Sequence, residues 1–149
     1  MTEYPDFALA VDAACSGNPG PMEYRGVLLR KSPNATNASG YVAVKDVFHY
    51  GPVHGTNNIG EFLAIVHALA LMKQKDITMT IFSDSMTAQT WVRNRKCKTT
   101  LTRTPETEEL LTLVARAEAW LRNNQPLTAP VIKWDTDTFG EIPADFGRK

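Results

Sequence analysis

The sequence predicts an α/β fold, in which helices pack on a mixed five-stranded sheet. Two observations predict it. Three apolar segments of strand-like composition come first, separated only by turns and a polar loop, which is typical of an antiparallel meander. Helix-spaced apolar segments then alternate with two further strand-like runs, which is typical of strands joined through helices. No linker divides the 149 residues, so we expect one domain over residues 1–149.

Residues that favour turns bound the three expected N-terminal strands. These strands cover residues 7–12, 24–29 and 41–50. The polar segment 31–40 separates the second from the third, and residues 51–55 are expected to form a loop. The apolar alternation of the third strand slips near Asp46, which indicates a β-bulge.

The apolar period changes to that of a helix after the third strand. Thr56, Asn57 and Asn58 are residue types that cap helices, and acidic residues from Glu106 onward favour the start of another helix. We expect helices over residues 58–74, 85–95 and 106–123, strands over 77–83 and 131–134, and a loop with one helical turn over 135–149. The three tryptophans are expected to pack in or beside the core rather than to stack on bases: Trp91, Trp120 and Trp134.

Composition narrows the functional classes. Sixteen basic and sixteen acidic side chains give a net charge of zero, so bulk charge does not hold this protein on nucleic acid. Only the short basic segment 93–98 could serve as a local patch that binds nucleic acid. It is equally consistent with a solvated helix end. No apolar run of about 18 residues predicts a membrane span. The first residues lack the pattern of a signal peptide, and two cysteines make no disulfide framework, so we expect a cytoplasmic protein with free thiols.

Carboxylates follow two of the expected strands. Asp12 and Asp84 each come directly after an apolar strand, and Glu61 lies near the start of the first helix. If the two strands are parallel neighbours, these acids meet at one sheet edge, with Asp145 as a fourth acid near the C-terminus. Clustered carboxylates repel one another and favour hard divalent cations such as Mg²⁺ or Mn²⁺. Taken singly, each of the first three acids has another interpretation. Asp12 could accept a hydrogen bond from its own turn, Glu61 could be a first-turn acid of its helix, and Asp84 could be a helix cap.

The ordered set of motifs resembles the type 1 ribonuclease H family. The segment from Asp12 to Pro21, DAACSGNPGP, is similar to the family's Asp-Gly-Ser-x-x-Gly-Asn-Pro-Gly. The segment from Thr56 to Glu61, TNNIGE, is similar to its Thr-Asn-Asn-x-x-Glu, and Asp84-Ser85 is similar to its Asp-Ser strand end. The match covers about residues 7–95, and the expected order of elements agrees along the chain.

The resemblance implies hydrolysis of the RNA strand of RNA–DNA hybrids by a monomer that uses two Mg²⁺ ions, with Mn²⁺ as a substitute. It implies that the metal ligands and catalytic acids are Asp12, Glu61, Asp84 and Asp145. It also implies hybrid contacts across the minor groove, where 2′-hydroxyls distinguish RNA from DNA. These contacts would come from Cys15, Gly17, Asn18, Asn57 and Asn58, with Thr56 touching a phosphate.

Departures from the family pattern leave a second function open. Ala13 and Ala14 replace Gly-Ser, and Met86 stands where the family often has Gln. No histidine precedes Asp145 in the last loop, and four residues follow it, so the family's last helix would be short or missing. Asp135 or Glu141 could take over the role of the histidine. The alternative is a hybrid-binding module with weakened or lost catalysis. A DNA resolvase or an ATP-handling protein ranks last, because no Walker-type loop is present.

Overall fold

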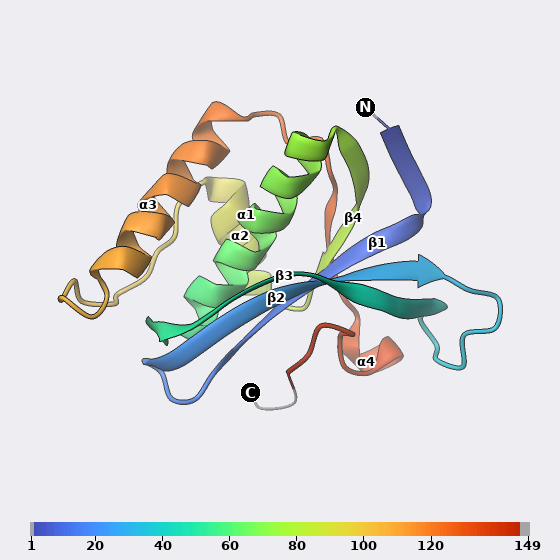
Figure 1. The fold of residues 1–149 in the computed structure, drawn as a ribbon, viewed down its shortest axis with the longest axis horizontal. Coiled ribbons are helices and arrows are strands. Elements are labelled where there is room, and N and C mark those ends of the chain that lie inside the picture. Colours follow the sequence, from blue (N-terminus) through green and yellow to red (C-terminus); the bar gives the residue numbers. More distant parts are fainter. Residues whose placement is uncertain (1, 147–149) are drawn as a thin grey trace.

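The computed structural model describes residues 2–146 and contains the expected order of strands and helices (Figure 1). The strands are β1 (Thr2–Cys15), β2 (Gly20–Lys31), β3 (Tyr41–Gly55), β4 (Ile77–Ser83) and β5 (Val131–Lys133). The helices are α1 (Asn57–Lys75), α2 (Met86–Asn94), α3 (Glu108–Asn123) and α4 (Thr136–Phe139).

The five strands form one mixed sheet in the order β3-β2-β1-β4-β5. Pairing is antiparallel between β1 and β2 and between β2 and β3, and it is parallel between β1 and β4 and between β4 and β5. The expected meander followed by parallel strands is therefore confirmed. The topology makes β1 the centre of the sheet, with β2 on one side and β4 on the other.

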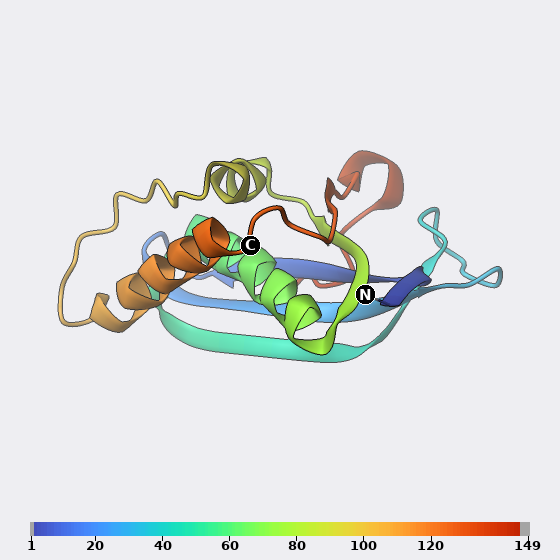
Figure 2. The ribbon, with the colours of Figure 1, turned by 90° about the horizontal axis from the view of Figure 1, so that it is seen from above.

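The two faces of the sheet are covered differently (Figure 1). Helices α1 and α3 lie over one face, whereas α4 and the C-terminal segment lie on the other. Figure 2, turned by 90°, shows α2 and α3 beside the central helix α1. Strand alternation explains the two cores, since Leu9 and Val11 of β1 pack with α1 while Ala8 and Ala10 pack with Trp134. Asp12 lies two residues after Ala10, so its side chain starts from the same face of the strand as Ala8 and Ala10.

Strand β3 is longer than expected, because the residues assigned to a loop pair with the start of β2. Gly20 is the register partner of Gly55, and Met22 that of Val53. The positive φ of Gly51 (104°) lies beside a register shift, so the irregular sequence is a bulge within the strand. The bulge expected near Asp46 is confirmed by a second shift in the pairing of β2 with β3.

Strands β1 and β2 are also longer than the expected 7–12 and 24–29, because their mutual pairing continues to Cys15 and Met22. The helices and the last two strands differ from the expected bounds by at most two residues at an end. Trp134 is buried in the second core, whereas Trp91 and Trp120 are partly buried against the first. Both cysteines are free, as expected. Among the described residues, no helix is both long and apolar enough to cross a bilayer. The expected shortening of a last helix concerns residues 147–149, which lie outside the described part of the chain.

Candidate active site

Asp12 lies where the parallel pairing of β1 with β4 has just ended. The last register pair of these strands is Ala10 with Phe82, so Asp12 and Asp84 each lie two residues beyond it. Strand β1 itself continues to Cys15 through its pairing with β2, so Asp12 lies within a strand rather than at its end. Its side chain is fully buried. The two aspartates are therefore brought to one edge by strand register, as the sequence predicts.

Glu61 reaches the same edge from α1. The helix begins after Thr56, whose hydroxyl accepts a hydrogen bond from the Ile59 amide at 3.3 Å. Glu61 is only 1% exposed, and its Oε1 atom accepts a hydrogen bond from the backbone N–H of Ala13 at 3.1 Å. This bond ties the helix acid to the residue after Asp12, so the two carboxylates are held on neighbouring backbones.

A glycine allows this close approach of α1 to β1. A Cβ atom added at Gly60 would lie 2.8 Å from the Cβ of Ala13 and 2.7 Å from the Sδ of Met22. Such distances are far shorter than ordinary van der Waals contact, so only glycine fits at this helix–strand contact. Ala13 is accommodated here, and its backbone amide still reaches Glu61. Alanine in place of the family's glycine at position 13 is thus compatible with the hydrogen bond to Glu61.

Asp84 connects β4 to α2 and is partly exposed. The next residue, Ser85, is the N-cap of α2, and its hydroxyl accepts a hydrogen bond from the Ala88 amide at 3.1 Å. The Ser83 carbonyl accepts a bond of 3.0 Å from the buried Gln89 side chain. Capping is therefore done by Ser85, and the alternative reading of Asp84 as the cap is wrong.

The three acids converge. One carboxylate oxygen each from Asp12, Glu61 and Asp84 lies within 4.8 Å of the other two. Bringing three negative charges together with two of the groups buried is unfavourable without a compensating cation. An all-oxygen donor set at this spacing fits a hard divalent ion such as Mg²⁺ or Mn²⁺. The residues present thus fit the metal site that the sequence predicts.

The family resemblance predicts Asp145 as a fourth acid of this cluster. In the structure, it is not a member of the group formed by the other three acids. Its backbone carbonyl accepts a hydrogen bond from Arg25, the register partner of Asp12. Its amide donates to the Ile142 carbonyl at 2.9 Å. The C-terminal segment is thus held on the same face of the sheet as Asp12, and the role of the Asp145 carboxylate stays a prediction.

Four of the six predicted hybrid contacts line one cavity of about 330 Å³: Cys15, Gly17, Asn18 and Asn57. The Asn18 side chain accepts a hydrogen bond from the Asn57 amide at 3.1 Å, which joins the turn after β1 to the start of α1. The Oδ1 atom of Asn57 is buried and has no hydrogen-bond partner within the described residues. A buried, unpaired amide oxygen thus belongs to one of the residues that line the cavity.

Thr56 and Asn58 lie outside that cavity. Thr56 lines a neighbouring cavity of about 280 Å³ with Asn18 and His54, and threonines of the segment 100–107 close it. Asn58 is exposed on the first turn of α1. The contribution of segment 100–107 was not foreseen. Its threonines have no periodic pattern, and only the packing of the loop before α3 brings them beside Thr56.

The two acids suggested as substitutes for a loop histidine lie in different surroundings. Asp135 caps α4, and its carboxylate accepts hydrogen bonds from the Thr138 hydroxyl (2.6 Å) and amide (3.2 Å). These bonds lower the pKa of the Asp135 carboxyl, which makes it a weaker base. Glu141 is exposed to solvent. The ring of His49, on β3, lies 6.3 Å from that of Phe146, so a histidine reaches the C-terminal segment from the sheet.

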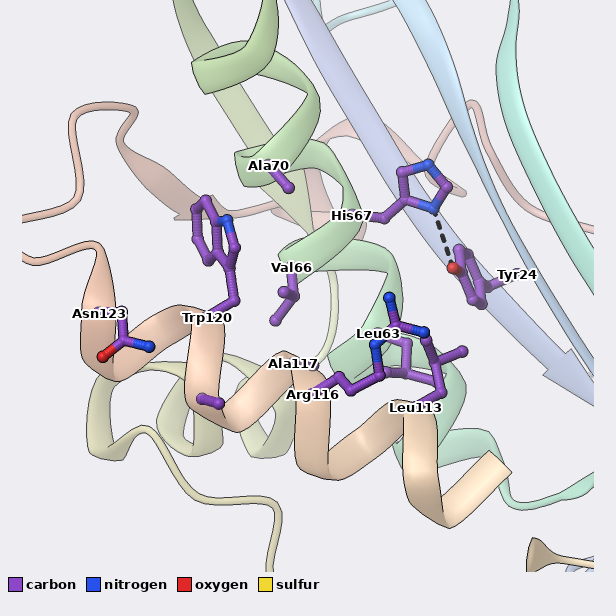
Figure 3. A pocket seen from close by; sticks show the side chains of 11 residues that line it. Tyr24, Leu63, Val66, His67, Ala70, Leu113, Arg116, Ala117, Trp120 and Asn123 are labelled. Carbon is purple, nitrogen blue, oxygen red and sulfur yellow. Dashed lines mark hydrogen bonds between the residues drawn. The ribbon is translucent and has the colours of Figure 1, made fainter. Parts of the chain in front are cut away.

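A further cavity of about 520 Å³ lies away from the three acids, between α1 and α3 (Figure 3). Its polar wall contains Tyr24 and His67, whose side chains are joined by a hydrogen bond of 2.9 Å. Burial lowers the pKa of His67 and raises that of Tyr24, so both groups stay neutral and the imidazole Nδ1 can accept a hydrogen bond from the tyrosine hydroxyl. This hydrogen bond connects β2, which contains Tyr24, to α1, which contains His67.

The fold and the site together define a class: a mixed-sheet α/β protein with a cluster of acids at the edge where its parallel strands end. A family model described as RNase H matches residues 5–132. Since that match covers most of the chain, the protein belongs to the ribonuclease H family, and the resemblance carried by its motifs is confirmed.

Individual relatives agree with this assignment. Ribonuclease H of Neorickettsia sennetsu is 31% identical over 98 residues, which span 60% of this chain and only 58% of that protein. Ribonuclease H of Bradyrhizobium diazoefficiens is 29% identical over 138 residues, spanning 90% of this chain and 78% of the relative. The solved structure of LC11-RNase H1, isolated from compost by a metagenomic approach, shares the fold with a TM-score of 0.54 at 19% identity, over 90% of this chain and 87% of that one.

Proposed function

We propose that this protein is a divalent-metal-dependent endoribonuclease that hydrolyses the RNA strand of RNA–DNA hybrids. The observation that carries the proposal is the convergence of Asp12, Glu61 and Asp84 within 4.8 Å in a chain of the ribonuclease H family. Their oxygens would hold two Mg²⁺ ions, with Mn²⁺ as a substitute and Asp145 as the fourth ligand. When bound, such a pair of ions supplies an activated water and stabilises the leaving oxygen of a phosphodiester.

The residues of the chain position the reacting groups. The Ala13 amide fixes one oxygen of Glu61, so this carboxylate keeps its orientation toward Asp12 while ligands exchange. Asp84 is partly exposed, which leaves the cluster accessible from the edge of the sheet. A substrate phosphate would enter from this side.

The cavity beside the cluster supports recognition of a hybrid. Its lining offers small side chains and the buried Oδ1 atom of Asn57, which suit close approach of a nucleic-acid backbone and hydrogen bonding to a 2′-hydroxyl. The adjacent cavity lined by Thr56 offers hydroxyl groups to a phosphate. With a net charge of zero, we expect affinity to depend on these local contacts and to fall as salt rises.

A monomer that acts in the cytoplasm is part of the proposal. Both cysteines are free, as is usual in a reducing compartment.

The experiment uses a hybrid labelled on its RNA strand, with Mg²⁺ and Mn²⁺ in separate reactions. We expect cuts confined to the RNA of the hybrid, with double-stranded DNA left intact. Asp84→Asn should abolish cleavage and leave hybrid binding largely unchanged, whereas Asp137→Asn, an exposed acid on α4, should behave as the unaltered protein. Full cleavage by Asp84→Asn with Mg²⁺ would refute the metal-ligand assignment.

The absence of a histidine from residues 135–146 favours one alternative, a hybrid-binding module without turnover. It predicts binding of the labelled hybrid without cleavage in either metal. Any cut confined to the RNA strand eliminates it.

A further inference from the structure

Arg25 connects the centre of the sheet to the C-terminal segment. It lies on β2, directly opposite Asp12 in the antiparallel pairing with β1, so both side chains start from the same face. The Arg25 Nε atom donates a hydrogen bond to the Ala144 carbonyl, and its Nη2 atom donates one to the Asp145 carbonyl, both at 2.8 Å. One guanidinium group therefore holds two successive peptide units.

Two further contacts fix the guanidinium group itself. Its Nη1 atom lies 3.7 Å from the carboxylate of Asp46 on β3, and its central carbon lies 4.7 Å from the ring centre of Phe146. Each nitrogen thus meets a different partner, and the ring covers one side of the plane. The planar, forked arrangement of donors is required for this geometry, and a lysine ammonium cannot reproduce it.

The segment held by Arg25 is fixed by individual side-chain and backbone contacts rather than by a helix or strand. Residues 140–146 contain no helix or strand. Ile142 and Ala144 are buried in the second core, which fixes the segment up to the residue before Asp145. The Asp145 amide donates a hydrogen bond to the Ile142 carbonyl, and the Asp145 carbonyl accepts one from Arg25. Arg25 therefore ties the backbone of Asp145 to the strand position directly opposite Asp12.

We propose that Arg25 is a positioning residue, which holds Asp145 beside Asp12 so that the Asp145 carboxylate can complete the metal site. This inference rests on the proposed function and extends it to a residue that contacts only protein. Because Arg25 binds backbone carbonyls rather than substrate, it acts on turnover through Asp145 and leaves hybrid binding nearly unchanged.

Kinetics of single variants give the first test. We expect Arg25→Ala and Arg25→Lys to lower kcat, by up to ~100-fold for a misplacement of about 1 Å, while KM for the hybrid changes by less than about threefold. Arg25→Lys should recover only part of the loss. Arg30→Ala, an exposed arginine on the same strand, is the matched control and should leave both constants unchanged.

A double-mutant cycle separates positioning from a general structural effect. If Arg25 acts through Asp145, Arg25→Ala adds no further loss of kcat to Asp145→Asn. Independent, multiplicative losses would overturn the proposal, as would an Arg25→Ala variant with unchanged kcat. A change confined to KM would also overturn it.

Two measurements do not depend on cleavage. Calorimetric titration with Mn²⁺ should show the same weakened binding step in Arg25→Ala and in Asp145→Asn, and hydrogen exchange at the Asp145 amide should be faster in Arg25→Ala. If the unaltered protein binds Mn²⁺ but cuts no hybrid, the proposed function fails while the inference on Arg25 is still decided by these two measurements. Arg25→Lys replaces Arg25→Ala in every assay if the alanine variant does not fold. Unchanged Mn²⁺ binding and exchange would overturn the inference.

Discussion

The backbone N–H of Ala13 donates a hydrogen bond of 3.1 Å to the Oε1 atom of Glu61, across 48 positions of sequence. This one bond joins the central strand β1 to the helix α1 at the point where the acidic cluster forms. It also gives Glu61 two separable roles, as a hydrogen-bond acceptor for the fold and as a negative charge in the site.

Glu61 substitutions should separate these roles. Glu61→Gln keeps an oxygen for the Ala13 amide and removes one of three repelling charges, so its free energy of unfolding without metal should equal or exceed that of the unaltered protein. Glu61→Ala leaves a buried N–H without an acceptor, which should lower the free energy of unfolding by about 1–3 kcal/mol. Urea unfolding in EDTA measures both. Equal destabilisation by the two variants would show that the charge itself stabilises the metal-free fold.

Gly60→Ala should destabilise the protein although alanine favours helices. The added Cβ would meet Ala13 at 2.8 Å and Met22 at 2.7 Å, so α1 must move away from β1. Overpacking of this kind costs about 1–3 kcal/mol, which exceeds the helix-propensity gain of about 1 kcal/mol. Thermal unfolding gives the change in stability, and Mn²⁺ titration should show weaker binding because Glu61 moves with the helix. A variant more stable than the parent would contradict the close contact.

Divalent metal should stabilise the folded chain. Binding to the native state alone raises the free energy of unfolding, by about 2.7 kcal/mol when free Mg²⁺ is one hundred times its dissociation constant. Thermal unfolding over a Mg²⁺ series shows this, with KCl at matched ionic strength as the control for charge screening. Asp12→Asn should abolish most of the shift. An identical shift with KCl would mean that the cluster binds no specific ion.

His67 should make stability depend on pH. Burial lowers its pKa from the ordinary 6.5, so the unfolded chain takes up this proton at a higher pH than the folded chain. The contribution of the neutral imidazole is therefore complete above pH 6.5 and is lost as the pH falls from 6.5 to the folded-state pKa. His67 is packed between the hydroxyl of Tyr24, at 2.9 Å, and the ring of Phe48, stacked at 4.0 Å between centres, so water is kept from part of its ring.

The measurement for this prediction is urea unfolding at a series of pH values between 5 and 8, a range that contains the ordinary titration of histidine. His67→Gln should remove this part of the pH dependence, while His54→Gln controls for loss of a histidine elsewhere in the chain. A pH profile that is unchanged by His67→Gln would disprove the assignment.

The sequence by itself determined the order of elements and three of the acids. Apolar residues recur every second position in strands and every three to four positions in helices. Both types of element can therefore be predicted from a short stretch of sequence, as for β4 and α1. The motifs around Asp12, Glu61 and Asp84 carry local turn and cap chemistry. They could therefore be read without knowing which strands pair.

Only the tertiary structure decided the features that depend on distant partners. The segment 51–55 is a strand because β2 supplies its hydrogen bonds, and no local pattern reveals that pairing. Gly60 matters because β1 passes beneath it, and Arg25 matters because residues 144–146 fold back onto β2. A side chain has one identity along the sequence, but its contacts are set by which backbones approach it, and that approach is fixed by the packing of the whole chain.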